Sequence, residues 1–344
     1  MGSTATMVMS LFQHVPTFHN EEVIKLAKHL YGVSCVAKQL PSERDQNFLL
    51  TSETGDRFVF KIANSLEQLI FLEAQNAAMT HLESNVSFCP RVISAKSGKQ
   101  IEQAPLDGIS HFVRLVTYIP GEPIANVKQT STLLFDLGKK LGEVTRALLS
   151  FDHPAFHREF HWDMVNATKV VRQYEELVTL PSLRKQVVTW ADNFESVVGR
   201  RIDKLPRSVI HGDANDYNVI VEDQRVVGLI DFGDMIHSLT AGELAIALAY
   251  VVLDQSDPLT CAKEVVAGYV SESSLNEDEL NVIWWLMLMR LCMSVCLAAH
   301  QQKQNPENTY LDISQQSIRD SLPQLLAIDP TYATDLFRQS SAAG

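Results

Sequence analysis

One stretch of the sequence, Ser208–Glu222, restricts the possible folds of this chain more than any other. It contains two short apolar runs separated by a polar loop that begins at His211, and such runs are typical of strands. A turn and a third apolar run follow directly and end at Asp231-Phe-Gly. The three predicted strands are Val209–Ile210, Asn218–Val221 and Val226–Ile230. The stretch therefore predicts a unit of strand, polar loop, strand, turn and strand.

The polar residues of this unit are the ones that phosphoryl transfer requires. The carboxylate of Asp213 can orient an acceptor hydroxyl and take its proton, whereas Asn218 and Asp231 can hold Mg2+ against nucleotide phosphates. The spacing His-x-Asp-x-x-x-x-Asn followed by Asp-Phe-Gly reproduces the order of the catalytic and metal loops of kinases. Asp and Asn are also common in ordinary turns, but the joint pattern favours the functional interpretation.

These residues carry a resemblance to a known family. His211-Gly-Asp with Asn218, followed by Ile230-Asp-Phe-Gly-Asp, resembles the aminoglycoside phosphotransferase/choline kinase superfamily, and within it the chain is most similar to hydroxylysine kinases. The resemblance extends from about residue 20 to about residue 325. The similar blocks are Asp45–Phe48, Val113–Gly121, His211–Ile220, Gly228–Met235 and Asn305–Asn308.

The resemblance implies an α+β, protein-kinase-like bilobal fold, with a small antiparallel-sheet lobe and a larger, mainly helical lobe. We expect a flexible N-terminal tail over residues 1–19, a nucleotide-binding lobe over 20–119, and a catalytic and substrate lobe over 120–344. In the first lobe, apolar alternation predicts five antiparallel strands. Their approximate ranges are 33–40, 47–52, 57–63, 91–96 and 111–118.

Lys61 and Glu73 are candidates for the strand lysine and helix glutamate that position nucleotide phosphates in kinases. Lys61 lies in the third predicted strand, and Glu73 lies in a helix predicted over residues 65–83. Both residue types are most often found facing solvent, so each has a simpler interpretation. Glu67 is an alternative partner for the lysine. The downstream motif favours a functional role for Lys61.

The hairpin Leu40–Asn47, where a glycine-rich phosphate loop would lie, contains no glycine. Close approach of the backbone to phosphates is therefore less favoured. Side chains of Ser42, Gln46 and Asn47 can donate hydrogen bonds instead, although a capped turn explains these residues equally well. The resemblance implies that the nucleotide base lies against the backbone of Thr117, Tyr118 and Ile119, and hydroxylysine kinases are known for using GTP.

The net charge and the cysteine content indicate which ligands and which cellular compartment suit this chain. The net charge of -12 gives no support to a nucleic-acid partner and suits a small cationic substrate. Five scattered cysteines predict reduced thiols and a cytoplasmic protein. Val282–Ala299 is apolar and almost long enough to span a membrane. Arg290 in its middle instead favours a buried helix of a helical lobe, so no membrane partner is expected.

Four residues are candidates for the acceptor site. Asp234, beside the metal loop, can meet a substrate ammonium, and Trp162 can form a wall of the pocket. Arg290 can bind a substrate carboxylate with two parallel hydrogen bonds, or can form a structural pair with Glu243 or Asp254. Glu243 itself is expected to act electrostatically at the start of a helix over 241–253. Asp213 is the fourth candidate, because it is expected to face the acceptor hydroxyl.

The sequence as a whole predicts a small-molecule kinase that uses Mg2+ and transfers the γ-phosphoryl group of GTP or ATP to a hydroxyl. The acceptor is an amino alcohol or amino acid, and the resemblance makes 5-hydroxylysine the leading candidate. A choline, homoserine or aminoglycoside kinase is the alternative within the same class. A nucleotide-binding regulator without turnover is the alternative outside it. The sequence does not predict an oligomeric state.

Overall fold

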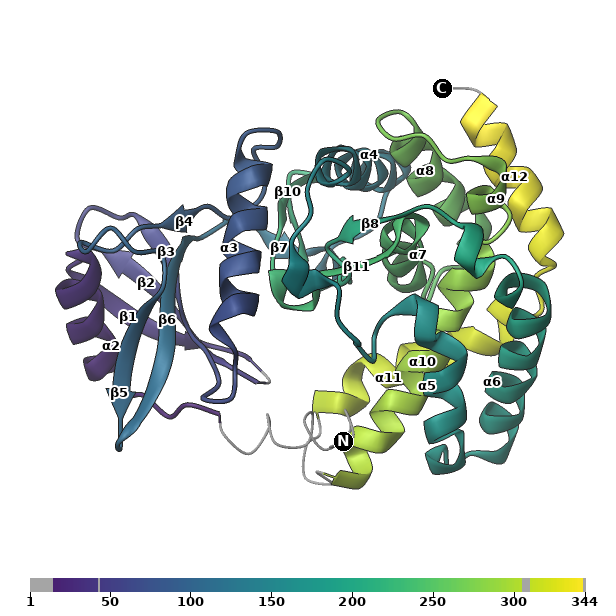
Figure 1. Cartoon of the computed structure of the whole chain (residues 1–344). Coiled ribbons are helices and arrows are strands. Elements are labelled where there is room, and N and C mark those ends of the chain that lie inside the picture. The colour runs from purple at the N-terminus through teal and green to yellow at the C-terminus, as the bar shows by residue number, and fades with distance from the viewer. Residues whose placement is uncertain (1–14, 43, 305–309, 343–344) are drawn as a thin grey trace. The chain divides into compact units, whose positions relative to one another are not determined.

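The computed structural model of the chain describes residues 15–42, 44–304 and 310–342 (Figure 1). The chain divides into two compact units, the first ending at Pro120 and the second beginning at Gly121. Most of the predicted flexible tail, residues 1–14, lies outside the described residues, as does the block Asn305–Asn308.

The first unit contains an antiparallel sheet of six strands in the order β1-β2-β3-β6-β4, with β5 paired to β6. Its hydrophobic core forms because side chains alternate across each strand, and in β2 every second residue is buried. Phe48, Phe60 and Leu115 are fully buried in this core. The strands are β1 (Cys35–Leu40), β2 (Gln46–Ser52), β3 (Arg57–Ile62), β4 (Val92–Ile93), β5 (Glu102–Leu106) and β6 (Ile109–Thr117).

The prediction of five strands missed β5, and it also made β4 too long. β5 contains Pro105 and no β-branched residue, so its composition does not indicate a strand. The turn that joins it to β6 is Asp107-Gly108, in which both residues have positive φ values of 50° and 81°. An Asp-Gly pair is a strong hairpin signal, and it is the feature from which β5 could have been found.

Two helices complete the first unit. α2 (Asn20–Leu26) continues into a π-helical turn and ends at Gly32. α3 (Leu69–Glu83) begins four residues later than the predicted start at residue 65. The reason is local: the Asn64 side chain accepts a hydrogen bond from the N–H of Leu66 and so stabilises a turn in place of a first helical turn.

The predicted strand, loop, strand, turn and strand are present in the second unit. β8 (Arg207–Ile210) leads into the polar loop, and β9 (Val219–Glu222) and β10 (Arg225–Leu229) form the hairpin after it. β8 does not pair with this hairpin but with β11 (Ile236–Leu239), whereas β9 also pairs with β7 (Glu122–Pro123). The loop is therefore held between two separate antiparallel pairs.

Helices make up most of the second unit, and two of them pack with their backbones in contact. A Cβ atom at Gly138 of α4 would lie 1.8 Å from the carbonyl oxygen of Val265, and one at Gly268 of α8 would lie 1.9 Å from that of Phe135. Only glycine permits this approach. The helices are α4 (Ser131–Leu148), α5 (Ala167–Tyr174), α6 (Pro181–Phe194), α7 (Thr240–Val251), α8 (Pro258–Val270), α9 (Glu277–Leu280), α10 (Ile283–Gln304), α11 (Tyr310–Leu326) and α12 (Pro330–Ala342).

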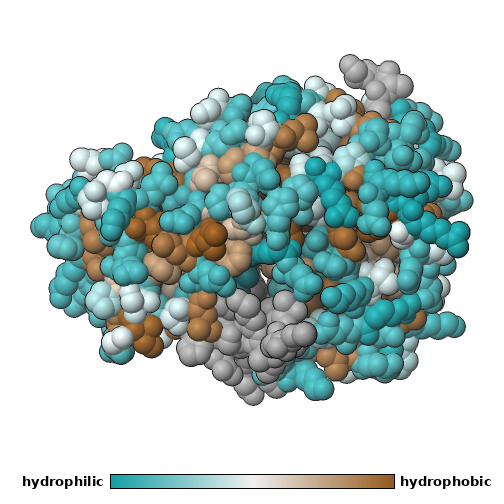
Figure 2. Space-filling model, viewed as in Figure 1, coloured by the Kyte–Doolittle hydropathy of each residue, from teal (hydrophilic) through white to brown (hydrophobic). Residues whose placement is uncertain are grey.

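α10 contains the apolar segment that the sequence analysis compared with a membrane span. Among the described helices, it alone is long and apolar enough to cross a membrane, but 78% of its apolar window is buried inside the protein. It packs against α5, α7 and α11. The face of the second unit visible in Figure 2 is mainly hydrophilic. This burial agrees with the predicted role of α10 as a core helix.

Candidate active site

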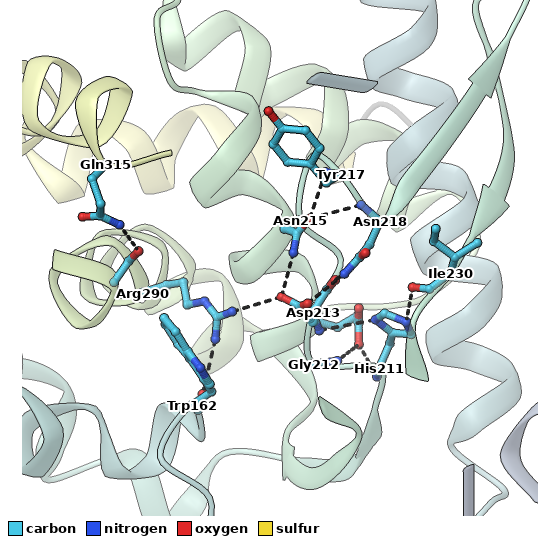
Figure 3. A network of polar contacts seen from close by, with 12 residues as sticks. Trp162, His211, Gly212, Asp213, Asn215, Tyr217, Asn218, Ile230, Arg290 and Gln315 are labelled. Atoms are coloured by element: carbon cyan, nitrogen blue, oxygen red, sulfur yellow. Dashed lines mark hydrogen bonds and ion pairs between the residues drawn. The ribbon is translucent and has the colours of Figure 1, made fainter. Parts of the chain in front are cut away.

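The loop after β8 holds the carboxylate of Asp213 between three donors (Figure 3). Oδ1 accepts hydrogen bonds from Nδ2 of Asn215 at 3.0 Å and from Nη2 of Arg290 at 3.3 Å, and Oδ2 accepts one from Nδ2 of Asn218 at 2.7 Å. The Asp213 side chain retains 20% of its surface exposed. The carboxylate is thus oriented by the protein while remaining accessible.

The same bonds determine how the Asn218 amide is oriented. Nδ2 of Asn218 also donates to the backbone carbonyl of Asp213 at 2.9 Å, so Oδ1 lies on the other side of the amide. Asn215 shapes the loop from within, because its Oδ1 accepts the backbone N–H of Tyr217 at 2.8 Å and that of Asn218 at 3.1 Å. Such an Asx turn is a local property of Asn.

Glu243, in the first turn of α7, binds the backbone at the start of this loop. Its Oε2 accepts hydrogen bonds from the N–H of His211 at 2.6 Å and of Gly212 at 3.2 Å. The residue is 1% exposed, and burial raises the pKa of its carboxyl to about 7 despite these two donors. The predicted role, purely electrostatic at the helix start, is therefore corrected: Glu243 anchors the loop.

His211 connects the Asp213 loop with the Asp-Phe-Gly segment. Nδ1 accepts the N–H of Asp213 at 3.3 Å, and Nε2 lies 3.1 Å from the carbonyl oxygen of Ile230. Its ring packs edge-on against Phe232, with the ring centroids 4.8 Å apart. Burial lowers the pKa of His211 to about 4. The imidazole is therefore neutral at pH 7, with its proton on Nε2, and its role is structural.

The Asp231-Phe-Gly-Asp segment closely approaches the Asp213 loop at Gly212. Gly212 has a φ of 80°, and a Cβ atom there would lie 2.8 Å from the carbonyl oxygen of Asp234. Asp231 is exposed and has a left-handed φ of 62°, and its Oδ1 accepts the N–H of Gly233 at 3.3 Å. Asp234 is only 9% exposed. The glycine is thus required where the two loops meet.

Several carboxyl groups gather around Asp213. Burial and the negative charge of Asp234 raise the pKa of Asp213 well above its usual range, whereas Arg290 lowers it. Burial also raises the pKa of Asp216, in the same loop, to about 6. A concentration of negative charge of this kind attracts cations.

Arg290, on α10, is 1% exposed. Its guanidinium lies 4.1 Å above the ring of Trp162, and Nη1 approaches the Trp162 carbonyl at 3.5 Å. The predicted structural pairing with Glu243 or Asp254 was wrong, because Nη2 bonds to Asp213 instead. Asp254 is exposed at a turn.

In the first unit, Lys61 lies on β3 opposite Asn47 on β2 and Arg114 on β6. Glu73 is on the exposed face of α3. Arg114 makes a polar connection between the sheet and α3, because it is buried and donates to Gln75 and, at 2.9 Å, to Asn76. The pairing of Lys61 with Glu73 stays a prediction.

Some side chains of the glycine-free hairpin Leu40–Asn47 make hydrogen bonds that stabilise the first unit. Gln46 is buried, and its amide bonds to the backbone N–H and carbonyl of Phe18 at 2.8 and 2.9 Å. Gln46 is therefore not the phosphate donor that the sequence suggested. Asp45 accepts the N–H of Asn64 at 2.9 Å. Ser42 is exposed, and Oδ1 of Asn47 is buried with no hydrogen-bond partner in the described part of the chain.

The segment expected to meet the nucleotide base begins at the end of β6. The N–H of Thr117 donates to the carbonyl of Arg91 at 2.9 Å, and the N–H of Tyr118 donates to that of Arg57 at 3.2 Å. These two donors are thus already engaged within the first unit. Contacts to a base from this segment would therefore use carbonyl oxygens or the N–H of Ile119.

Comparison with known proteins decides the family. Residues 36–275 match the phosphotransferase enzyme family. The chain belongs to this family. The phosphotransferase is also 31% identical over 328 residues to a protein from Xenopus laevis named hydroxylysine kinase, with 88% of this chain and 87% of that protein covered. The predicted resemblance and the predicted enzyme class, a phosphotransferase with an alcohol group as acceptor, are confirmed.

Solved structures confirm the predicted kinase-like fold class of the phosphotransferase. An amicoumacin kinase in complex with AMP-PNP, Ca2+ and Ami is similar with a TM-score of 0.70 at 16% identity, covering 92% of this chain and 97% of that one. A microcompartment-associated aminopropanol kinase is similar with a TM-score of 0.68 at 15% identity, covering 93% and 98%. At these identities, the similarity concerns the fold alone.

The donor atoms of the phosphotransferase suit a hard divalent cation. Asn218 offers an amide oxygen and Asp231 a carboxylate, and Mg2+ prefers oxygen ligands of this kind. Within the described ranges, no group of three or more His, Cys, Asp or Glu side chains is arranged to hold a metal ion. A cation at these two residues would therefore need further ligands from a nucleotide, as it has in kinases.

Two buried charged residues, one in each unit, were not recognised in their roles from the sequence. Glu243 anchors the loop, and Arg114 connects the sheet to α3. The available signal was a charged residue within an apolar stretch, Thr240–Val251 for Glu243 and Ile109–Thr117 for Arg114. A buried charge requires a partner, but the sequence does not name the partner.

Proposed function

We propose that this phosphotransferase transfers the γ-phosphoryl group of GTP or ATP to the hydroxyl of a small amino-bearing metabolite, with 5-hydroxylysine as the leading acceptor. The observation that carries the proposal is the Asp213 carboxylate, held by Asn215, Asn218 and Arg290 yet partly exposed. The names of the similar proteins, a hydroxylysine kinase and an aminopropanol kinase, support an acceptor with both an amino group and a hydroxyl.

Asp213 is the proposed catalytic residue. Each carboxylate oxygen has two lone pairs, so an acceptor hydroxyl can donate to Asp213 while its bonds to the loop are kept. The carboxylate orients the hydroxyl oxygen toward the γ-phosphorus and receives the proton as the new O–P bond forms. The bond from the γ-phosphorus to the β–γ bridging oxygen breaks in the same step, and GDP or ADP leaves. The bonds from Asn215 and Asn218 hold the carboxylate still during this step.

Asn218 and Asp231 are the proposed Mg2+ ligands. Bound Mg2+ supplies positive charge beside the phosphate oxygens, where negative charge develops. For the nucleotide, we propose that Lys61 contacts the phosphates, with Glu73 orienting it. Side chains of Ser42 and Asn47 add hydrogen bonds, and the backbone of Thr117, Tyr118 and Ile119 faces the base.

Charge supports the choice of acceptor. Asp234 is buried close enough to Asp213 to raise its pKa, and Asp216 lies in the same loop. Their carboxylates favour a substrate ammonium group, which an acidic surface also attracts. We propose that Asp234 binds this ammonium and that Trp162, partly buried, forms one wall of the acceptor pocket.

A coupled nucleotide-turnover assay tests the function. GTP and ATP are each combined with 5-hydroxylysine, homoserine, choline, 1-amino-2-propanol and an aminoglycoside, and lysine serves as the control that lacks the hydroxyl. We expect Mg2+-dependent turnover and a phosphorylated product with 5-hydroxylysine, and none with lysine. Asp213→Asn should reduce turnover by about 10²- to 10⁴-fold, the typical contribution of a general base, with little change in nucleotide affinity.

Each alternative gives a different result in this assay. A clear preference for choline would reject an amino acid as the acceptor. A preference for homoserine would replace 5-hydroxylysine by another amino acid as the proposed acceptor. Equal activity of Asp213→Asn and the wild type would remove Asp213 from the mechanism. Nucleotide binding without phosphorylation of any acceptor would favour a regulator without turnover.

A further inference from the structure

The contact between Arg290 and Asp213 joins two segments that are 77 residues apart in the chain. Arg290 lies within α10, the apolar core helix, and its side chain is 2% exposed. Burial of a guanidinium is costly unless the charge is paired. Nη2 lies 3.3 Å from Oδ1 of Asp213. The buried charge is therefore paired with the carboxylate that we propose to be catalytic.

The guanidinium is held on several sides. The Trp162 ring covers one face at 4.1 Å, and the Trp162 carbonyl lies 3.5 Å from Nη1 (Figure 3). The side chain of Tyr250, on α7, also interacts with the Arg290 guanidinium. These contacts restrict rotation of the arginine, so it presents Nη2 to Asp213 in a defined direction. A preorganised donor of this kind loses little entropy when it binds.

This arrangement does not suit the carboxylate-binding role considered from the sequence. An incoming carboxylate requires two parallel N–H donors that it can reach. Nη2 and Nη1 already face Asp213 and the Trp162 carbonyl, and the side chain is almost completely buried. Because the Arg290 side chain is almost completely buried, a substrate carboxylate could reach the guanidinium only if the packing around α10 opened.

We propose that Arg290 is a positioning residue that holds the Asp213 carboxylate in the orientation required to meet the acceptor hydroxyl. The inference rests on the proposed function, because it assumes that Asp213 faces the acceptor. Asn218 fixes Oδ2 and Arg290 fixes Oδ1 from the side of α10, so together they determine the plane of the carboxylate. Without Arg290, Asn215 and Asn218 still bind the carboxylate, but its rotation is less restricted.

The test compares Arg290→Gln and Arg290→Lys with a matched control, Ser294→Ala. Ser294 lies one turn further along α10, is buried, and accepts a hydrogen bond from Gln315 at 3.1 Å. The control thus removes a buried polar contact from the same helix without touching Asp213. With the acceptor found in the panel, Arg290→Gln should lower kcat about 10- to 100-fold, the loss expected for a hydrogen bond to a charged group. KM for acceptor and nucleotide should stay within about 3-fold, because binding is not the step affected.

Two further measurements identify Asp213 as the residue through which Arg290 acts. In the Asp213→Asn background, Arg290→Gln should cause no additional loss of kcat, since the effects of residues that act as a unit are not additive. Arg290→Lys, which keeps the charge but not the planar group, should retain more activity than Arg290→Gln. Ser294→Ala should remain within about 2-fold of the wild type if its loss is that of an ordinary contact.

The outcomes separate this inference from the proposed function. A rise in KM for amino-acid acceptors alone, with kcat unchanged, would overturn the inference and make Arg290 the carboxylate ligand. Additive losses with Asp213→Asn would also overturn it. Crystal structures of the wild type and of Arg290→Lys, which can be used if Arg290→Gln does not fold, give a readout independent of activity. An Asp213 carboxylate that keeps its wild-type orientation although the introduced lysine does not contact it rejects the positioning role, whereas a wild type that phosphorylates no amino-bearing acceptor rejects the proposed function.

Discussion

The Oε2 atom of Glu243 accepts a hydrogen bond from the backbone N–H of His211 at 2.6 Å, across 32 positions of sequence. The contact fixes the first residue of the Asp213 loop to the first turn of α7. Because the carboxyl is 1% exposed, its protonation state depends on the folded structure and differs from that of the unfolded chain.

This contact predicts a pH dependence of stability. The pKa of Glu243 rises from 4.5 to about 7 on folding. Between these values the folded state holds a proton that the unfolded state has lost, so this group's stabilisation is complete below pH 4.5 and is lost as pH rises through 7. The shift from 4.5 to about 7 corresponds to about 3 kcal/mol. The difference in unfolding free energy between the wild type and Glu243→Gln, measured by denaturant titration, should therefore decrease over this range.

Three neighbouring groups make the difference measurement necessary. Asp213 and Asp216, whose pKa values are both raised by burial, change stability in the same direction as Glu243. His211, with a pKa lowered to about 4, does the opposite, because its unfolded form gains a proton as pH falls below 6.5. These contributions cancel when the unfolding free energy of the mutant is subtracted from that of the wild type. A difference that is flat from pH 4.5 to 7 would show that Glu243 does not change its protonation on folding.

A second prediction concerns the approach of the two loops at Gly212. Gly212→Ala introduces a Cβ atom 2.8 Å from the Asp234 carbonyl at a φ of 80°. Gly55 is the matched control, since its φ is 86° but nothing lies within 4 Å of its Cβ position. Gly55→Ala should cost about 1 kcal/mol of stability through backbone strain alone. Gly212→Ala should cost about 1–3 kcal/mol more, by chemical denaturation, and should lower turnover. Equal costs would mean that the loops separate without penalty.

A third prediction concerns the metal. Asp231→Asn should remove Mg2+-dependent nucleotide binding, because the carboxylate charge is lost while Asn tolerates the left-handed φ of 62°. The control is Asp254→Asn, which changes an exposed aspartate of similar φ, 57°, elsewhere in the second unit. Isothermal titration of nucleotide with and without Mg2+ measures the effect. Tight binding of Mg2+-nucleotide to Asp231→Asn would remove Asp231 from the metal site.

A fourth prediction concerns the phosphate contacts of the first unit. Lys61→Met should raise the KM for nucleotide at least 10-fold, corresponding to a loss of about 1.4 kcal/mol of binding energy or more. Glu73→Gln should have a milder effect if Glu73 orients the lysine. Glu73 is exposed, whereas Glu67 is half-buried. Impairment of Glu67→Gln together with normal kinetics of Glu73→Gln would assign the partner to Glu67.

Local structure was predictable from the sequence because short-range patterns determine it. The apolar runs around His211, the polar loop with Asp213 and Asn218, and the Asp-Phe-Gly turn all lie within a short segment of the chain. Hydrogen bonds such as those of Asn215 to Tyr217 and Asn218 span only a few residues. Pattern and turn chemistry therefore identify the loop that we propose to be catalytic, and the family follows from it.

Local sequence patterns gave wrong predictions where the amino-acid composition of a segment does not match the hydrogen bonds that it forms. Glu102–Leu106 has little strand propensity and becomes β5 only because β6 offers it a partner across the Asp107-Gly108 turn. The start of α3 was misjudged because the Asn64 side chain competes for the backbone N–H of Leu66. In both cases, a specific hydrogen bond overrides average propensity.

By itself, the sequence determined that one charged residue, Arg290 in the middle of an apolar helix, had to be buried. Arg290 therefore required a partner, since an unpaired charge is not stable in a protein interior. The tertiary structure alone decided that the partners are Asp213 for Arg290, and Gln75 and Asn76 for Arg114. The periodicity of a sequence indicates whether a side chain faces the protein interior. Which residue it contacts there, tens of positions away in the chain, depends on how the helices and strands pack.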